Sequence, residues 1–159
     1  MVDGIKNQKL RSLKVLSLDR VVNIVTLIES GHGEKQNAIR FLAGYSAFMA
    51  KGKTSVATKL LSFAVSEIKH LSMVHNLIER HAFIKPIFSV EGQTQKLDFE
   101  KQNLKKTLIE MTCAKCALIA DYERVIKTSE SQISKELTKI LLEEKEHALV
   151  LKSFIEQEL

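Results

Sequence analysis

Hydrophobic residues recur at intervals of three and four along most of the chain, which is the period of an amphipathic α-helix. Leu, Ile, Ala, Lys and Glu dominate these stretches, strand formers never settle into an alternating run, and Pro86 is the only proline. We therefore predict an all-α protein.

The first apolar stretch begins at Ser17 or Asp19, either of which can cap a helix. Its hydrophobic residues are Val21, Val22, Ile24, Val25, Leu27 and Ile28. The sequence Gly31-His32-Gly33 then interrupts the pattern, either as a break or as a weakened join to the next helix. That next helix has apolar and aromatic residues at alternating spacings of four and three, and Gly52 is its natural end.

Three longer helices are predicted at about 55–82, 99–127 and 130–158. Their candidate caps are Thr54 or Ser55, Asp98, and Ser129. The four main stretches are long enough to form a helical bundle, with the first apolar stretch as an extra N-terminal helix.

The connection after the helix at 55–82 is long and has no sustained period, with Pro86 and Gly92 inside it. Fifteen extended residues reach about 50 Å, and the preceding helix is about 40 Å long. Such a connection is needed only if the helices that it joins are parallel, so we predict a bundle with one long crossover. No linker-like composition divides the chain, and we expect an N-terminal segment, 1–18, and one bundle domain, 19–159.

Each of the four main helices has one ionisable residue inside its apolar stripe. These residues are Glu34, Glu67, Lys115 and Glu144, and their neighbours seven positions away are apolar or aromatic. A carboxylate in a core needs a cation, a hydrogen-bond network or a metal, because otherwise its pKa rises until it is neutral.

The spacing Glu-x-x-His occurs twice, at Glu67 and His70 and again at Glu144 and His147. Residues three apart on a helix project from the same side, with Cβ atoms about 5–6 Å apart, so both side chains can bind one metal ion. The chain thus contains two similar helix pairs. One carries Glu34, Glu67 and His70, and the other carries Lys115, Glu144 and His147.

Two helices that each contribute a Glu, with two that each contribute Glu-x-x-His, form the ferritin-like di-iron or di-manganese carboxylate bundle. Over residues of about 20–158 the sequence resembles that superfamily, most nearly its rubrerythrin, manganese-catalase and spore-coat catalase-like members. Gly33-Glu34 followed by Phe41 is similar to the first-helix pattern, a Glu with an aromatic residue seven positions later. Lys115 followed by Tyr122 is similar to the third-helix pattern, with the Glu replaced by lysine.

The resemblance implies a ferritin-like four-helix bundle and an oxidoreductase activity: ferrous-ion oxidation, peroxide reduction or disproportionation, or O₂ activation. It implies iron or manganese as the cofactor, with metal ligands at Glu34, Glu67, His70, Glu144 and His147. The rubredoxin module of rubrerythrins is missing, so peroxide reduction would need an external electron donor. We also expect a homo-oligomer, most simply a dimer.

Lys115 changes the charge of the expected site. With Glu34, Glu67 and Glu144 it gives a net charge of minus two, which one divalent ion would balance and two protonated histidines would balance equally. Its ammonium could reach water along the helix, pair internally with a carboxylate in place of a metal, or act chemically as an amine or proton donor.

Lys115 and Tyr122 are accordingly the candidate catalytic residues, although an aromatic residue at core spacing such as Tyr122 or Tyr45 can equally be packing alone. The competing hypothesis is a metal-free structural or interaction protein in which Lys115 replaces the charge of the metal.

The remaining features narrow the partners. The net charge of +5 is spread among nearly as many acidic residues, so nucleic acid is not an expected partner. No apolar run is long enough to cross a membrane, and no signal peptide is evident, so we expect a soluble cytoplasmic protein without a membrane partner.

Several polar residues close to the site in sequence are not expected to belong to it. Cys113 and Cys116 form one CxxC, which cannot build a four-cysteine site within one chain, and we expect two small buried residues there. Four acidic residues lie off the apolar stripes and are expected to be solvated: Asp121, Glu123, Glu143 and Glu146.

Overall fold

The computed structural model describes residues 17–82 and 103–157. They form five helices: α1 (Leu18–Glu29), α2 (Glu34–Ala50), α3 (Thr54–Ala82), α4 (Leu104–Thr128) and α5 (Ser131–Gln157). There is no strand within these ranges, which confirms the predicted all-α class. None of the described helices is long and apolar enough to cross a membrane.

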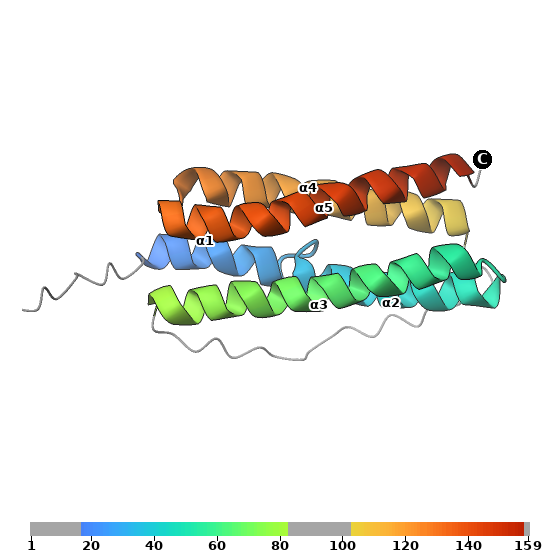
Figure 1. The fold of residues 1–159 in the computed structure, drawn as a ribbon, viewed down its shortest axis with the longest axis horizontal. Coiled ribbons are helices and arrows are strands. Elements are labelled where there is room, and N and C mark those ends of the chain that lie inside the picture. Colours follow the sequence, from blue (N-terminus) through green and yellow to red (C-terminus); the bar gives the residue numbers. More distant parts are fainter. Residues whose placement is uncertain (1–16, 83–102, 158–159) are drawn as a thin grey trace, which may run out of the picture.

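α1 and α2 follow one another along one side of the bundle, and α3, α4 and α5 occupy the other three positions (Figure 1). The predicted N-terminal helix is therefore present as α1, and it packs inside the bundle instead of outside it. Its residues Ile24, Leu27 and Ile28 belong to the same buried cluster as Leu77 of α3 and Leu137 of α5. α1 thus extends the hydrophobic core beyond the first residue of α2.

A tight turn at Ser30–Gly33 separates α1 from α2, so the two glycines of this stretch mark a break. The Gly33 N–H donates to the Ser30 carbonyl at 2.9 Å, and a Cβ at Gly33 would lie 2.5 Å from the Ile28 carbonyl oxygen. Only glycine allows this approach. The turn starts α2 at Glu34, whose side chain is fully buried in the bundle.

α3 and α4 run parallel, as the length of their connection predicted. Leu60 near the start of α3 and Leu108 near the start of α4 share one core cluster. Ile78 and Val125, near the ends of these helices, share the other. In Figure 1 both helices run from the right end of the bundle to the left, and the segment that joins them lies at residues 83–102, outside the described ranges.

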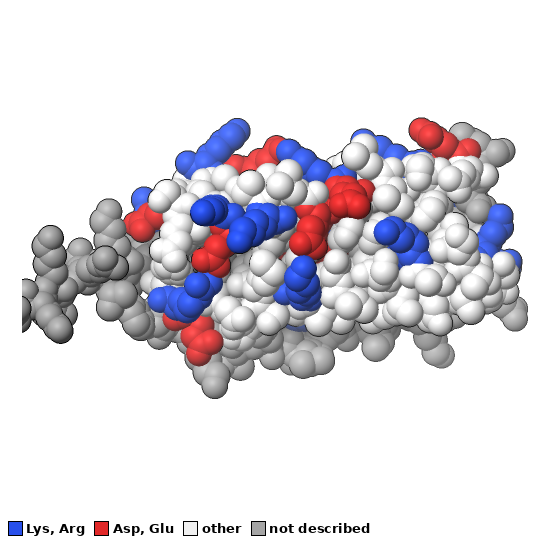
Figure 2. Space-filling view, viewed as in Figure 1, with Lys and Arg blue, Asp and Glu red and all other residues white. Residues whose placement is uncertain are grey.

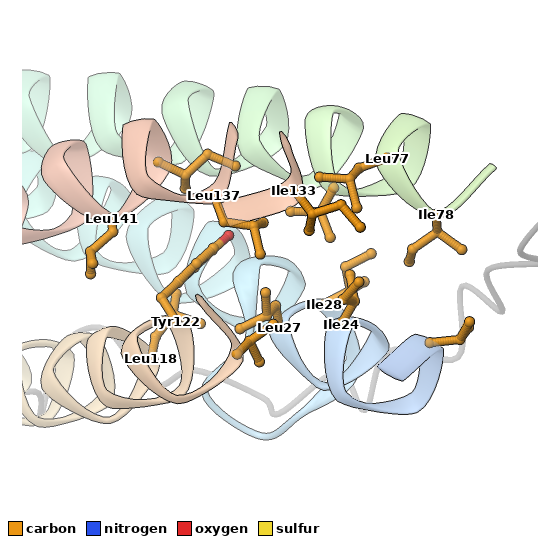
Figure 3. Packing of buried hydrophobic residues seen from close by; sticks show 14 of the residues in the cluster. Ile24, Leu27, Ile28, Leu77, Ile78, Leu118, Tyr122, Ile133, Leu137 and Leu141 are labelled. Carbon is orange, nitrogen blue, oxygen red and sulfur yellow. The ribbon is translucent and has the colours of Figure 1, made fainter. Parts of the chain in front are cut away.

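The core consists of two apolar clusters, one toward each end of the bundle. Figure 3 shows side chains of α1, α3, α4 and α5 converging on the cluster at the α1 end. Buried ionisable side chains occur at the first residue of α2 and near the middle of α3, α4 and α5: Glu34, Glu67, His70, Lys115, Glu144 and His147. A core that accepts so many ionisable groups must satisfy their charges internally.

Two surface features bear on the expected partners. On the face made by α3 and α5, Lys and Arg are interspersed with Asp and Glu toward the α1 end, with no continuous basic patch in that view (Figure 2). Cys113 and Cys116 are both exposed on α4, so the expectation that they are buried is wrong. They flank Lys115 on α4 but face outward, whereas Lys115 faces the core.

Candidate metal centre

The bundle brings together all the site residues that the sequence predicts, from four helices. α2 supplies Glu34, α3 supplies Glu67 and His70, α4 supplies Lys115 and Tyr122, and α5 supplies Glu144 and His147. All are fully buried except His147, which is 7% exposed. These residues converge because the apolar stripe of each helix, in which they lie, faces the interior of the bundle, and residues three apart on a helix project from the same side.

Four of these side chains form a compact group of possible metal ligands. Glu34, Glu67, His70 and Glu144 each offer one atom, and these atoms all lie within 4.8 Å of one another. Two ligands on opposite sides of one ion, each about 2.0–2.2 Å away, are about 4–4.4 Å apart. The group therefore needs only a small contraction to bind one ion.

His147 stands next to this group. Its Nδ1 lies 3.3 Å from Glu67 Oε1 and 4.0 Å from Glu144 Oε1. Its ring packs against Phe63, with the ring centroids 4.2 Å apart. His147 can therefore act as a fifth ligand or as a neighbour of the ligand group.

The polar atoms that face the interior of the group lack ordinary partners. Within residues 17–82 and 103–157, the following buried site atoms have no hydrogen bond: Glu34 Oε2, Glu67 Oε1, His70 Nδ1, Glu144 Oε1 and His147 Nδ1. His70 Nδ1 does lie 2.8 Å from Glu144 Oε1, but the contact lacks hydrogen-bond geometry. Unsatisfied buried polar atoms are rare in proteins, and the five at this site are carboxylate oxygens or imidazole nitrogens, which suit a transition-metal ion.

Lys115 lies on the other side of the same carboxylates. Its Nζ donates to Glu67 Oε2 at 2.6 Å and also to Glu144 Oε2, and its side chain is fully buried. The ammonium also lies 5.2 Å from the centre of the Phe41 ring, a distance typical of a cation–π contact. Of the alternatives for Lys115, the one that takes its ammonium to water is therefore wrong, and the internal ion pair is present.

The protonation states follow from these contacts. Burial lowers the pKa of Lys115, but the charges of Glu67, Glu144 and Glu34 outweigh burial and raise it, so the ammonium stays charged. Burial also tends to raise the pKa of Glu67, yet contacts with His147 and Lys115 lower it to about 2. Lys115 therefore holds an ionised Glu67 in the core.

Glu34 and His70 behave differently from Glu67. Burial raises the pKa of Glu34 to about 8, helped by the charges of Glu144 and Glu67. Burial tends to lower the pKa of His70, but Glu144 and Glu34 raise it to about 10. Without a metal at neutral pH, the layer thus contains a neutral Glu34 and a protonated His70, and a metal would displace both protons.

Tyr122 donates its hydroxyl to Glu34 Oε1, and both groups are fully buried. Burial and the adjacent Glu34 raise the pKa of the phenol, so it remains a donor. This bond leaves Glu34 Oε2 directed at His70 Nδ1, 3.6 Å away. Tyr122 thus orients a candidate ligand, while Tyr45 is only partly buried against the opposite apolar cluster.

Glu143 belongs to the site, contrary to the expectation that it is solvated. Its Oε2 lies 3.0 Å from His70 Nε2, and its Oε1 accepts from Lys69 at 3.3 Å. A partner at Nε2 fixes the ring and leaves Nδ1 directed toward the ligand group. The sequence did contain a signal, because Glu143 immediately precedes Glu144, one of the ligands facing His70.

Comparisons with known proteins bear on the fold. No protein-family model matches the chain, and no curated protein sequence matches it. Among solved structures, the chain is similar to KatB, a manganese catalase from Anabaena, with a TM-score of 0.69 and 18% identity over 98% of this chain and 80% of that one. A structure of KatB from Anabaena PCC7120 gives the same TM-score with 19% identity over 99% of this chain and 80% of that one. The likeness confirms the fold that the sequence resemblance implied: the chain has the ferritin-like helical-bundle fold.

Proposed function

We propose that this protein is a ferritin-like metalloprotein that binds one iron or manganese ion and acts as an oxidoreductase on peroxide or O₂. The observation that carries the proposal is the convergence of buried carboxylate oxygens and imidazole nitrogens that have no hydrogen bond in the described part of the chain. The naming of KatB as a manganese catalase supports the same class of chemistry.

One ion is proposed instead of two because Lys115 lies on the far side of the shared carboxylates. Glu67 and Glu144 each direct one oxygen at Lys115 and the other toward the ligand group. An ammonium already compensates one charge there, so one divalent ion balances what remains. A second ion beside Lys115 would have to share its carboxylate oxygens with a fixed cation.

The proposed roles follow from the contacts. Glu34, Glu67, His70 and Glu144 would hold the ion, with His147 beside them, and the bound ion would supply redox chemistry toward peroxide or O₂. Glu143 keeps the His70 Nδ1 lone pair directed inward, because it accepts from the opposite ring nitrogen.

The candidate catalytic residues act from either side of that group. Tyr122 is a neutral proton donor in direct contact with Glu34. Lys115 holds Glu67 and Glu144 in place and keeps Glu67 ionised. Electrons for a peroxide reductase would come from an external donor.

One observation supports the metal-free alternative: the charges of the buried ionisable residues balance without a metal. Lys115 and a protonated His70 are matched by the carboxylates of Glu67 and Glu144, and Glu34 is neutral below its pKa of about 8. In that case the protein would be a structural or interaction protein that keeps the bundle without its cofactor.

Metal content decides between the two functions. Protein produced with iron and manganese supplied should contain about one equivalent of metal, and Glu67→Ala/His70→Ala should contain none. The matched control is Glu79→Ala/His81→Ala, which removes the same residue types from the end of the same helix and should retain the metal. Metal that survives in the first variant, or none in the wild type, would contradict the proposal.

An isosteric variant, Glu34→Gln, tests metal binding without a risk that the protein fails to fold. Because Glu34 is neutral in the folded metal-free protein but ionised in the unfolded chain at neutral pH, Glu34→Gln should raise the free energy of unfolding in chelator and not lower it. It should nevertheless weaken metal binding at least tenfold, since it removes an anionic ligand. Peroxide consumption and O₂ uptake by the loaded protein, with Glu34→Gln as the reference, then test the reaction class.

A further inference from the structure

The outer face of α4 carries a short strip with no charged residue in it: Ile109, Cys113, Cys116 and Ala120. Ile109 is 42% exposed, and both cysteines are exposed unpaired thiols. The site described above lies on the inner side of this helix and uses none of them. Exposed dithiols on a charge-free helical strip need a partner to be shielded from water and oxidation.

The spacing of the four residues in the strip is the same in both directions along the helix. Its spacings are four, three and four, so its centre falls between Cys113 and Cys116. If a second copy packs its α4 antiparallel across a two-fold axis at this centre, Ile109 meets Ala120 and Cys113 meets Cys116 of the other copy. Two-fold interfaces are self-complementary in just this sense.

The charged residues beyond the strip fit the same arrangement. Lys106 lies seven residues before Cys113 and Glu123 lies seven residues after Cys116, so each Lys106 would approach the other copy's Glu123. Lys105 and Arg124, each eight residues outside the cysteine pair, would also come together, and the charge of Arg124 is already compensated by Asp121 at 2.6 Å. The small residues Cys and Ala at the centre allow the helices a close approach.

We propose that two copies of this chain associate through α4 and bind one zinc ion between them, with Cys113 and Cys116 of both copies as the four ligands. On one helix, side chains three apart have Cβ atoms about 5–6 Å apart, and thiolates on one zinc ion are about 3.8 Å apart. Two such pairs complete the tetrahedral four-thiolate site that one chain cannot form alone. Zinc binding converts the four thiols to thiolates and releases four protons to solvent, without oxidation or reduction.

The test measures mass and zinc together in the presence of a phosphine reductant. With zinc supplied, light scattering after size exclusion should report a dimer, and a chelator should return it to a monomer. The Cys113→Ser/Cys116→Ser variant should stay monomeric and should contain about half an equivalent of zinc less per chain than the wild type. Ile68→Ser, which changes an exposed residue of α3, should dimerise like the wild type.

Cobalt(II) distinguishes this site from the one in the bundle core. Thiolate-to-cobalt charge-transfer absorption should appear in the wild type, vanish in the double serine variant, and persist in Glu67→Ala/His70→Ala. A wild-type protein that stays monomeric with zinc supplied, a dimer that the double serine variant retains, or a dimer that reductant abolishes would each overturn the proposal. The last result would identify disulfides between copies instead of a metal.

Discussion

The buried ionisable residues form a polar layer in the bundle core. One side of this layer offers metal ligands, and the other side contains the Lys115 ammonium. The ligand side comprises Glu34, His70, Tyr122 and Glu143, with His147 beside them, and the lysine side comprises Lys115 and Phe41. Glu67 and Glu144 are shared, because each directs one oxygen to each side.

The surroundings of each ionisable residue match its charge. Glu34 accepts a hydrogen bond from the Tyr122 hydroxyl, whereas Lys115 lies over the Phe41 ring, whose π face attracts a cation. His70 has the carboxylate of Glu143 at its outer nitrogen. The position corresponding to Glu143 in the other Glu-x-x-His repeat is Ser66, and His147 packs on Phe63. The lysine side thus surrounds a permanent cation, the Lys115 ammonium. The side chains of the ligand side suit a metal ion, which accepts lone pairs from oxygen and nitrogen.

Removal of the Lys115 ammonium should have the largest effect on the stability of the protein. Lys115→Met leaves Glu67 and Glu144 facing one another without their cation, so the free energy of unfolding in chelator should fall by about 3–5 kcal/mol. Urea unfolding measures the loss. Lys145→Met is the control, because Lys145 pairs with Glu123 at the surface, and its loss should change the free energy of unfolding far less. Equal losses would show that Lys115 is not the compensating charge.

Conversion of the lysine side into a second ligand side should change the metal stoichiometry. In Lys115→Glu the added carboxylate faces Glu67 and Glu144, so bound metal should rise from about one to about two ions per chain. Elemental analysis after removal of unbound metal measures this ratio. A ratio that stays near one would mean that other features of the lysine side, such as the Phe41 ring, also prevent a second ion.

Loss of the outer partner of His70 should weaken metal binding. Glu143→Ala frees the ring of His70, and we expect a 10–100-fold lower affinity. Ser66→Ala changes the corresponding position of the other repeat and should leave the affinity unchanged. Competition with a metal-indicator dye measures both variants, and similar effects would argue against a special role for Glu143.

Loss of the Tyr122 hydroxyl should have a moderate effect on stability. Tyr122→Phe leaves Glu34 Oε1 buried without its donor, which should cost about 1–3 kcal/mol of the free energy of unfolding. Tyr45→Phe, at the half-buried tyrosine, should cost less than about 0.5 kcal/mol. Urea unfolding of the chelated proteins at neutral pH compares the two.

The smallest predicted effect concerns the contact that holds the α1–α2 turn against α4. Although burial tends to raise the pKa of Asp121, hydrogen bonds from Arg124 and His32 lower it below 3.8, so this acid is not simply solvated as the sequence suggested. Because the folded-state pKa is depressed, the stabilisation is present above the unfolded value and is lost as the pH falls through the folded value. Asp121→Asn should therefore cost about 1 kcal/mol at pH 6 and progressively less below pH 4, as measured by urea unfolding. A difference that does not shrink in acid would contradict this assignment.

The sequence by itself determined the helical class, the parallel arrangement of α3 and α4, and the residues that meet in the core. These features depend on periodicity and chain length, which are local: a stripe of period 3.6 faces inward wherever its helix packs, and a long connection is required between parallel helices. Glu34, Glu67, Lys115 and Glu144 could be placed together for that reason. The predicted burial of Cys113 and Cys116 was wrong, although the same pattern argues against it, because neither cysteine shares the stripe of Met111, Lys115 and Leu118.

Only the tertiary structure decided which atoms contact one another across the bundle. Whether Lys115 reaches water or Glu67, and whether Glu143 meets solvent or His70, depends on the rotation and register of α3, α4 and α5 about one another. Those variables are set by packing between helices that are distant in sequence, and the pattern along one helix carries no record of them.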